Sequence, residues 1–513
     1  MEPAEIDLLR DPRAYPHPVG DGVRVIQTHI SWVLLAGEYA YKIKKPVRFG
    51  FLDYSTPPLR RTMCEREVAL NRRACDGVYL DVVAVVARRG QLAFHGDGDV
   101  VEHAVKMWRL PEASWLSARV ATGGATPDLL YDVARAVHAF HTRAESSPEI
   151  ARFGTPDTVM AIWRENLDEL AEFAGDTVDR TDLPRLAAYA DRFLAQARDV
   201  IAGRAATGRV RDGHGDLRSD SIVIRENGGV CLADCIEFND RLRCSDIAGD
   251  VGFLSMDLDA RGHPELSDAF AGRYVELAWD DETLSYVLPF YRCYRALVRA
   301  KVESITARER EAAADEAAAA RQRAHRHMAL ARQYTLADEG PCLLVVGGLS
   351  GTGKSHIAAA LAARIGAVLI RSDAVRRALF AGVTPAYDAA ARARVYREMR
   401  QRAKEHLHAR RTVVLDATHI ERAERTSARA VAEAASVPML LIWVDAPDEI
   451  IRSRLLRRDA GDVSDARWET YVRQRERSEP PDSGELAAGV ALDGAANASD
   501  NIARICAALT NLR

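Results

Sequence analysis

The chain has few of the residues that mark secreted or membrane proteins. Its 513 residues include only 8 cysteines, and aromatic residues make up 7%. No apolar run approaches the ~20 residues that a membrane-spanning helix needs, so we expect no membrane contact. The first residues lack the basic segment and the apolar core of a signal peptide. Cys231 and Cys235 have no second pair to complete a zinc site, and we expect reduced thiols in a cytoplasmic protein.

A strong excess of either charge is also missing. The chain carries 70 Lys and Arg against 74 Asp and Glu, a net charge of -4. This balance argues against non-specific binding to nucleic acid or to an anionic membrane, although it leaves room for a local basic groove. Hydrophobic residues at 48% and charged residues at 28% are ordinary for a globular protein. The length allows two to four domains.

The most informative segment is a glycine-rich loop between an apolar strand, Cys342–Val346, and a helix expected to begin near Lys354. The segment reads G-x-x-x-x-G-K-S, the P-loop pattern, whose backbone N–H groups surround a phosphate. Lys354 would reach the β- and γ-phosphates of ATP, and the Ser355 hydroxyl would bind Mg²⁺. The predicted ATP-binding residues are Gly348, Leu349, Ser350, Gly351, Thr352, Gly353, Lys354 and Ser355. A flexible surface loop is the alternative interpretation.

Apolar strands and amphipathic helices alternate after a polar break near residue 335. This alternation predicts an α/β P-loop domain over 336–513 with a parallel sheet. The strand-like segments are CLLVVGG, AVLIRSD, TVVLDAT, PMLLIWVDAP and the weaker VALDG. Residues 1–335 start with strand-like segments and turn mostly helical after Pro111, which predicts an α+β two-lobed domain. Its N-lobe would span about 1–110 and its C-lobe about 111–335.

Two carboxylates are predicted to meet at one end of a β-hairpin in the C-lobe. The runs SIVIR and VCLAD flank ENGG, and Asn-Gly is a strong hairpin signal. Counting back from the turn places Ser221 opposite Asp234, with Asp216 at the same end of the hairpin. Two such groups suit a general base and a metal ligand. A solvated loop with acidic caps is the alternative.

The segments HGDL, the hairpin after it, and THISWVLLAGEYAYKIKKPVRFGFLDYST resemble the aminoglycoside phosphotransferase-like kinases, relatives of the protein-kinase fold. The whole chain resembles bacterial two-domain proteins that fuse such a domain to an AAA-type P-loop kinase. The resemblance implies that Asp216 is the catalytic base and Asp234 the principal Mg²⁺ ligand. It also implies that Lys42 positions ATP. Lys44 lies on the same face of the strand and is the rival.

Two further ATP-binding residues follow from this resemblance. Glu67 lies on the apolar stripe of the next helix, whereas Glu65 lies off it, so Glu67 is expected to pair with Lys42. KMWRLP is similar to the hinge under adenine, with backbone near Met107 supplying hydrogen bonds; Met107 as core is the alternative. Many relatives read H-G-D-x-H-x-x-N, but this chain has Arg218 and Ser221 at the last two fixed positions. A serine there is a poorer metal ligand than an amide oxygen.

Acidic and basic residues after the strands of the P-loop domain are candidates for acceptor chemistry. Asp373 would accept the proton of a substrate hydroxyl, and Arg376 would hold substrate charge, in an S-D-x-x-R pattern that resembles polynucleotide kinases and zeta-type toxins. Asp416 would act on Mg²⁺ through water. Helix N-caps are the alternative for both aspartates. The segment RSRLLRRDAGDVSDARW resembles a kinase lid, in which Arg454, Arg457 and Arg458 would neutralise the transferring phosphate.

The leading hypothesis is an ATP- and Mg²⁺-dependent phosphotransferase that acts on a hydroxyl of a small molecule. One alternative is a polynucleotide 5′-kinase, which the acidic net charge disfavours. The other is that the first domain is a nucleotide-binding pseudokinase that regulates the P-loop half, which Ser221 favours. The acceptor and the oligomeric state are open at this point.

Overall fold

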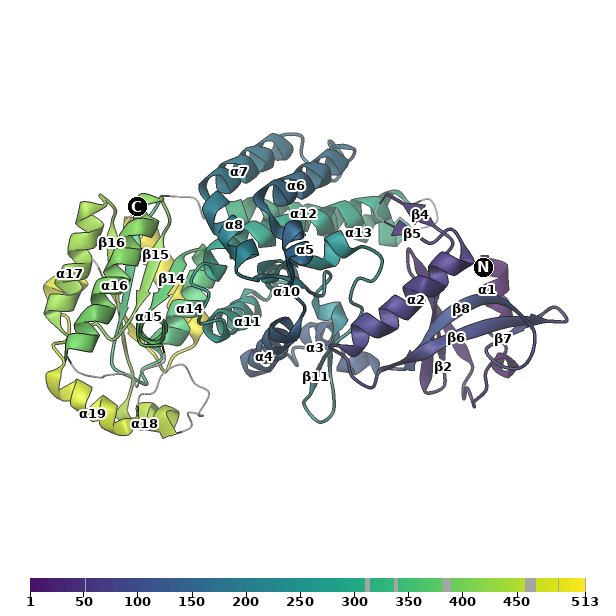
Figure 1. Ribbon diagram of the computed structural model, residues 1–513, viewed down its shortest axis with the longest axis horizontal. Helices are drawn as coiled ribbons and strands as arrows, with labels where there is room; N and C mark the ends of the chain where they lie inside the picture. Colours follow the sequence, from purple (N-terminus) through teal and green to yellow (C-terminus); the bar gives the residue numbers. More distant parts are fainter. Residues whose placement is uncertain are drawn as a thin grey trace. The chain divides into compact units, whose positions relative to one another are not determined.

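The computed structural model describes residues 1–50, 52–309, 314–335, 340–381, 389–456, 467–487 and 489–512 (Figure 1). Contacts group the chain into two compact units. Unit 1 comprises 1–125, 139–154 and 204–250, and unit 2 comprises 126–138, 155–203 and 251–513. The boundary expected near residue 335 stays a prediction, because these units group residues by contact rather than by sequence pattern.

Unit 1 contains a six-stranded antiparallel sheet in the order β1-β2-β3-β8-β6-β7. Helix α2 (Pro57–Arg72) packs against β6 and β8. Alternate residues of β2 and β3 bury apolar side chains such as Leu34 and Ile43, because successive side chains of a strand point to opposite faces. The strands are β1 (Val23–Gln27), β2 (Ser31–Ala36), β3 (Tyr39–Lys44), β6 (Tyr79–Arg88), β7 (Gln91–Ala93) and β8 (Asp99–Trp108).

The predicted C-lobe hairpin is present, but its register was predicted wrongly by one residue. Strand β10 (Ile222–Ile224) pairs with β11 (Val230–Leu232), so that Ile222 faces Leu232. The amide of Ala233 donates to the Ser221 carbonyl at 2.8 Å, and Ser221 therefore lies opposite Ala233 rather than Asp234. The cause is the turn: Gly228 has φ +80°, and Arg225 closes a three-residue loop rather than the four-residue loop expected.

Two cysteines of unit 1 lie against each other. Cys75, shortly after α2, contacts Cys231 of β11, and their Cα atoms are 4.6 Å apart. The expectation of reduced thiols stays a prediction. Five of the other six cysteines are buried.

The helices predicted after Pro111 are present, and most lie in unit 2. They are α4 (Pro127–Arg143), α6 (Pro156–Ala171), α7 (Asp182–Gln196), α8 (Arg198–Ala206), α10 (Ile247–Ala260), α11 (Pro264–Leu277), α12 (Leu284–Arg308) and α13 (Ala314–Thr335). Within the described ranges, no helix is both long enough and apolar enough to span a bilayer.

Unit 2 also contains a five-stranded parallel sheet in the order β14-β15-β13-β16-β17, which confirms the predicted parallel α/β fold. All five predicted strands are present: β13 (Leu343–Gly347), β14 (Val368–Arg371), β15 (Val413–Asp416), β16 (Met439–Asp445) and β17 (Gly489–Asp493). Their buried residues are almost continuously apolar, as in sheets covered on both faces. In parallel sheets with helices on both faces, ligands bind at the carboxyl ends of the strands.

The P-loop helix packs directly on helices from the first 335 residues, within unit 2. Helix α14 (Lys354–Ile365) contacts α11 and α12, and a Cβ at Gly272 of α11 would come within 2.8 Å of the Ala360 Cβ. The Ser285 hydroxyl donates to the Ala367 carbonyl at 2.6 Å. The amide of Leu369 in β14 donates to the Glu282 carbonyl at 3.0 Å. The P-loop sheet and these helices therefore share one packed interior.

Candidate functional site

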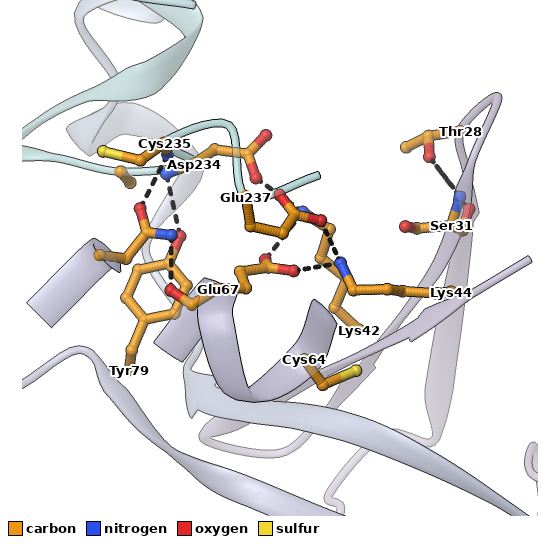
Figure 2. Close-up of polar contacts among 12 residues, drawn as sticks. Thr28, Ser31, Lys42, Lys44, Cys64, Glu67, Tyr79, Asp234, Cys235 and Glu237 are labelled. Carbon is orange, nitrogen blue, oxygen red and sulfur yellow. Dashed lines mark hydrogen bonds and ion pairs between the residues drawn. The ribbon is translucent and has the colours of Figure 1, made fainter. Parts of the chain in front are cut away.

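Two lysines of β3 share one buried carboxylate in unit 1. Lys42 and Lys44 point to the same face of the strand because they are two residues apart. Lys42 Nζ lies 2.9 Å from Glu67 Oε1, and Lys44 Nζ lies 2.7 Å from Glu67 Oε2 (Figure 2). The predicted ion pair between Lys42 and Glu67 is therefore confirmed. Lys42 is the more accessible lysine, with 14% of its side chain exposed against 1% for Lys44.

Asp234 joins this cluster from the segment after the hairpin. Its Oδ1 lies 2.6 Å from Lys42 Nζ, and 59% of its side chain is exposed. The backbone of Asp234 has φ +66°, a conformation that non-glycine residues seldom adopt outside functional sites and tight turns. It is held by the Tyr79 hydroxyl, which accepts from the Asp234 amide at 3.0 Å, and by Asn71, which accepts from the Cys235 amide at 2.9 Å. The cluster thus presents a carboxylate at a fixed position beside Lys42.

Glu237 and Tyr54 complete the cluster, and the sequence analysis missed both. Lys44 forms an ion pair with Glu237, and Glu237 accepts a hydrogen bond from the Tyr54 hydroxyl (Figure 2 shows Glu237). Burial alone would raise the pKa of Glu67, but the ammonium groups of Lys42 and Lys44 hold it well below its usual value. Burial likewise opposes the charge of Lys44, yet Glu237 and Glu67 keep its pKa well above the usual value. Glu67 and Lys44 are therefore both ionised at neutral pH.

Asp250 of α10 holds the loop that carries Asp216. Its two carboxylate oxygens accept hydrogen bonds from the amides of His214 at 2.8 Å and Gly215 at 2.9 Å. The His141 ring lies 3.2 Å from the same carboxylate. The His214 ring contacts the Ala233 carbonyl at 2.9 Å, which ties this loop to the end of the hairpin. The loop before Asp216 is therefore held by hydrogen bonds of its backbone amides and of the His214 side chain.

Asp216 is already paired with a cation. Arg218 donates to both of its carboxylate oxygens at 3.0 Å, and also to Asp220 at 3.1 Å. The Ser221 hydroxyl donates to the Asp216 carbonyl at 3.1 Å and accepts from the Arg218 amide at 2.9 Å. Through these contacts the Ser221 hydroxyl stabilises the conformation of the loop. A metal-binding role for Ser221 stays a prediction.

Two backbone amides of the predicted hinge are paired within unit 1. The amide of Trp108 donates to the Val78 carbonyl at 3.0 Å, and that of Arg109 donates to the Glu38 carbonyl at 2.8 Å. Met107 lies inside β8, between β3 and β6, and packs on a cluster that includes Val68. Met107 is partly buried, and the prediction that backbone near Met107 contacts adenine stays a prediction.

The P-loop has the backbone that its pattern predicts. Gly348, Gly351 and Gly353 have φ of +141°, +88° and +97°, values that glycine adopts without strain. A Cβ at Gly348 would come within 2.2 Å of the Val444 carbonyl oxygen, so the loop passes close to β16. Helix α14 begins at Lys354 as predicted, directly after Gly353. A helix N-terminus at this place favours bound phosphate.

Ser355 and Asp416 meet beside the P-loop. The Ser355 hydroxyl donates to Asp416 Oδ1 at 3.1 Å, and Arg371 lies 3.4 Å from the other oxygen. Asp416 faces Val346 of β13 and Arg371 of β14 across the sheet. The helix that follows β15 begins at Arg422 and has Glu421 as its N-cap, so the N-cap alternative for Asp416 is wrong.

These two oxygens fit Mg²⁺. Magnesium usually takes one or two protein oxygens and completes its coordination with water and substrate phosphates. A hydroxyl and a carboxylate 3.1 Å apart at a P-loop match that requirement. Among the described residues, no group of three or more His, Cys, Asp or Glu side chains could hold a metal by itself. Magnesium that arrives with a nucleotide does not need such a group.

Asp373 lies two residues beyond the end of β14, in the first turn of α15 (Ser372–Leu379). The N-cap of this helix is Arg371, and therefore the N-cap alternative for Asp373 is wrong. Arg376 follows one turn later on the same helix and is half-buried. Their roles toward an acceptor stay predictions.

Arg454 contacts the backbone of the P-loop, and its role toward the transferring phosphate stays a prediction. It lies on α18 (Asp448–Leu456) and donates to the carbonyl oxygens of Thr352 at 3.0 Å and Gly494 at 2.8 Å. Because backbone N–H groups rather than carbonyls face a phosphate in a P-loop, these contacts favour bracing the loop over neutralising phosphate. The predicted lid residues Arg457 and Arg458 lie outside the described residues.

Gln474 is a second P-loop contact that the sequence analysis missed. It lies on α19 (Trp468–Arg477), and its Oε1 accepts from the Ser350 amide at 3.0 Å. A glutamine in a charged helix carries no sequence signal for such a contact.

Comparisons with known proteins agree with this architecture. A family model described as an AAA domain matches residues 343–481. Two solved structures are similar to parts of the chain. A GDP and kanamycin complex of APH(2")-IIia has TM-score 0.40 and 12% identity, covering 64% of this chain and 97% of that chain. A gluconokinase from Sinorhizobium meliloti 1021 has TM-score 0.27 and 22% identity, and the match covers 34% of this chain and 93% of that chain. At these TM-scores, neither structure supports an argument about activity.

Three mycobacterial proteins match nearly the whole chain. These are "Uncharacterized protein Mb2027c" of Mycobacterium bovis and "Uncharacterized protein MT2060" and "Uncharacterized protein Rv2004c" of Mycobacterium tuberculosis. Each is 33% identical over 482 residues, which cover 91% of this chain and 93% of the relative. The chain therefore belongs to the family of these mycobacterial proteins, and its residues 343–481 match an AAA domain.

Proposed function

We propose that the protein is an ATP-dependent phosphotransferase whose P-loop site moves the γ-phosphoryl group of ATP to a hydroxyl of a small molecule. The observation that carries the proposal is the contact between Ser355 and Asp416, 3.1 Å apart at the start of the P-loop helix. A P-loop alone binds phosphate, whereas this pair adds the oxygen ligands that a magnesium-bound triphosphate needs.

The surrounding residues supply the rest of the chemistry. Lys354 would contact the β- and γ-phosphates, and Mg²⁺ held at Ser355 would neutralise charge on them. The acceptor oxygen would form a bond to the γ-phosphorus while the bond to the β–γ bridging oxygen breaks and ADP leaves. Asp373 would take the proton of the acceptor hydroxyl. A cavity of about 480 Å³ lined by Gly353, Arg454 and other residues adjoins the loop and is large enough for a nucleoside base.

The test separates the P-loop site from the cluster in unit 1 within the intact chain. Lys354→Ala should lower ATP turnover by a factor that corresponds to ~3–4 kcal/mol, as for other groups that stabilise developing charge. Lys42→Met is the matched control, because it removes the ammonium group of the other predicted nucleotide site. Turnover that falls with Lys42→Met but survives Lys354→Ala would contradict the assignment.

Asp373 needs a separate measurement because a base acts on the acceptor and not on ATP. Labelled ATP incubated with the protein and a metabolite extract should give a labelled acceptor. Asp373→Asn should keep nucleotide affinity and lose this transfer. If transfer survives in Asp373→Asn, the aspartate is not the base. If the labelled product is a polynucleotide 5′-end, the small-molecule proposal is wrong.

The N-terminal region supports a second candidate function, a nucleotide-binding module with weak or no transfer. The supporting observation is the two-point ion pair of Asp216 with Arg218, because a carboxylate held by a guanidinium is a poorer proton acceptor. We infer that ATP binds near Lys42, Glu67 and Asp234 without efficient turnover.

The double variant Arg218→His/Ser221→Asn restores the pattern of many relatives and tests this idea. Measured in the Lys354→Ala background, it should raise magnesium-dependent transfer, while nucleotide affinity changes little. Robust transfer by Lys354→Ala alone, unchanged by the double variant, would show that the N-terminal site is an active kinase without these residues. Lys42→Met should remove nucleotide binding in either case.

A further inference from the structure

A buried arginine without its full set of hydrogen-bond partners lines a cavity in unit 2. Arg292 of α12 has 1% of its surface exposed, and its Nη1 donates to the Ala363 carbonyl at 3.2 Å. Its Nε and Nη2 have no hydrogen-bond partner among the described residues. A buried guanidinium with unmet donors is strongly unfavourable unless another group satisfies it. The cavity beside it has a volume of about 230 Å³.

The opposite charge is also present in this cavity. Asp259 of α10 lines it, and its Oδ2 accepts a hydrogen bond from the Tyr334 hydroxyl at 2.5 Å. Its Oδ1 has no hydrogen-bond partner, although Arg364 Nη1 lies 3.9 Å away. The cavity therefore has unmet donors on Arg292 and an unmet acceptor on Asp259. Apolar walls come from residues such as Pro264, Pro289 and Leu330.

We propose that this cavity binds a small carboxylate that also carries a hydrogen-bond donor, either an ammonium group, as in an α-amino acid, or a hydroxyl, as in a hydroxy acid. The carboxylate would accept from Arg292 Nε and Nη2, and the donor would bind Asp259 Oδ1. A planar guanidinium suits two-point binding of a carboxylate. No residue of the P-loop or of the lysine cluster lines this cavity, so the proposed ligand is not the substrate of either site.

The cavity lies beside the P-loop helix α14, so that a ligand in it could affect that helix. Arg292 lies on α12 and Asp259 on α10, whereas Arg364 lies in the last turn of α14 (Figure 1 labels these helices). Ala363, whose carbonyl accepts a hydrogen bond from Arg292, also lies on α14. A ligand that fills the cavity would therefore join α14 to the two helices beside it.

The experiment uses the intact chain and four probes: glycine, L-lactate, acetate and inorganic phosphate. Binding is measured by calorimetry, together with the ligand-dependent rise in Tm. Glycine or lactate should bind and raise Tm, and whichever binds tighter identifies the donor as ammonium or hydroxyl. Acetate and phosphate do not combine a carboxylate with a hydrogen-bond donor, and they should bind at least tenfold more weakly. Equal binding of acetate or phosphate would overturn the ligand class, and no binding by any probe would mean that the cavity holds water alone.

Two substitutions test the residues. Arg292→Met should weaken the binding of glycine or lactate by roughly ten- to hundredfold, the effect of hydrogen bonds to a charged group. Without ligand it should leave Tm equal or higher, because it removes a buried cation with unmet donors. Asp259→Asn should reduce the preference for glycine or lactate over acetate. Unchanged binding in both variants would refute the proposal.

A matched control lies three residues along the same helix. Arg295 is also buried, but it lies over the Phe253 ring at 4.6 Å from the centroid and is not among the residues that line the cavity. Arg295→Met should lower Tm and leave probe binding unchanged. If Arg292→Met behaves in the same way as Arg295→Met, Arg292 is structural and the proposal fails.

Discussion

Replacing Lys44 by methionine should destabilise unit 1 strongly. The lysine is 1% exposed and forms ion pairs with both Glu67 and Glu237. Without it, Glu67 keeps Lys42 as partner, whereas the hydrogen bond left to Glu237 among the described residues comes from the Tyr54 hydroxyl. Removing one partner of a buried ion pair leaves an uncompensated charge, and such changes reduce the free energy of unfolding by about 3–5 kcal/mol. A surface pair contributes only about 0–1 kcal/mol.

Hydrogen exchange in the intact chain measures this change locally, because a two-unit chain need not unfold in one step. Each 1.4 kcal/mol is a factor of ten, so slow amides of β3 and α2 should exchange more than about a hundredfold faster in Lys44→Met. Peptides from the P-loop sheet should be unchanged. The surface control is Arg24→Met, which removes an exposed ion pair with Glu112 at 2.7 Å.

The double variant Lys44→Met/Glu237→Gln makes the reasoning refutable. It removes both members of one buried pair and leaves the pair of Lys42 with Glu67 intact. If the loss in Lys44→Met comes from the stranded charge of Glu237, the double variant should recover a large part of it. Exchange in the double variant as fast as in Lys44→Met, or no acceleration in Lys44→Met, would show that the ion pairs contribute little.

Three further predictions follow from other sites. Gly348→Ala should abolish ATP binding at the P-loop in calorimetry, since its Cβ would lie 2.2 Å from a carbonyl oxygen, whereas Gly203→Ala, with open space around it, should not. The pKa of Glu67 is held below its ordinary 4.5 by Lys42 and Lys44 despite burial. Its contribution to stability is therefore complete above that value and is lost as pH falls below it, which acid unfolding followed by exchange of α2 will show; a loss only above pH 7 would contradict it. Asp250→Asn replaces one acceptor by a donor facing a backbone amide, and should speed exchange of residues 210–216 by an amount that corresponds to about 1–3 kcal/mol; unchanged protection there would contradict the role of Asp250.

Sequence patterns predicted most of the structural features that are determined by residues close together in the chain. The strand, loop and helix around Lys354 follow from spacing and glycine positions. Ser355 and Asp416, each expected to act on Mg²⁺, meet at the shared edge of the parallel strands. The pairing of Lys42 with Glu67 came from strand alternation and the helix stripe.

Features that depend on a single turn or on distant partners were missed. The hairpin register shifted because Gly228 adopts positive φ, and loop length cannot be counted from Asn-Gly alone. Glu237 and Gln474 have ordinary sequence surroundings, and only the tertiary fold brings them to Lys44 and Ser350.

The contacts of α14 with α11 and α12 restrict how the protein can be divided. A protease or a gene truncation that cuts near residue 335 would separate Ser285 from Ala367 and Glu282 from Leu369, and would expose the alanine-rich face of α14 to water. The resulting fragments should aggregate rather than remain active, because exposed apolar faces of this kind associate.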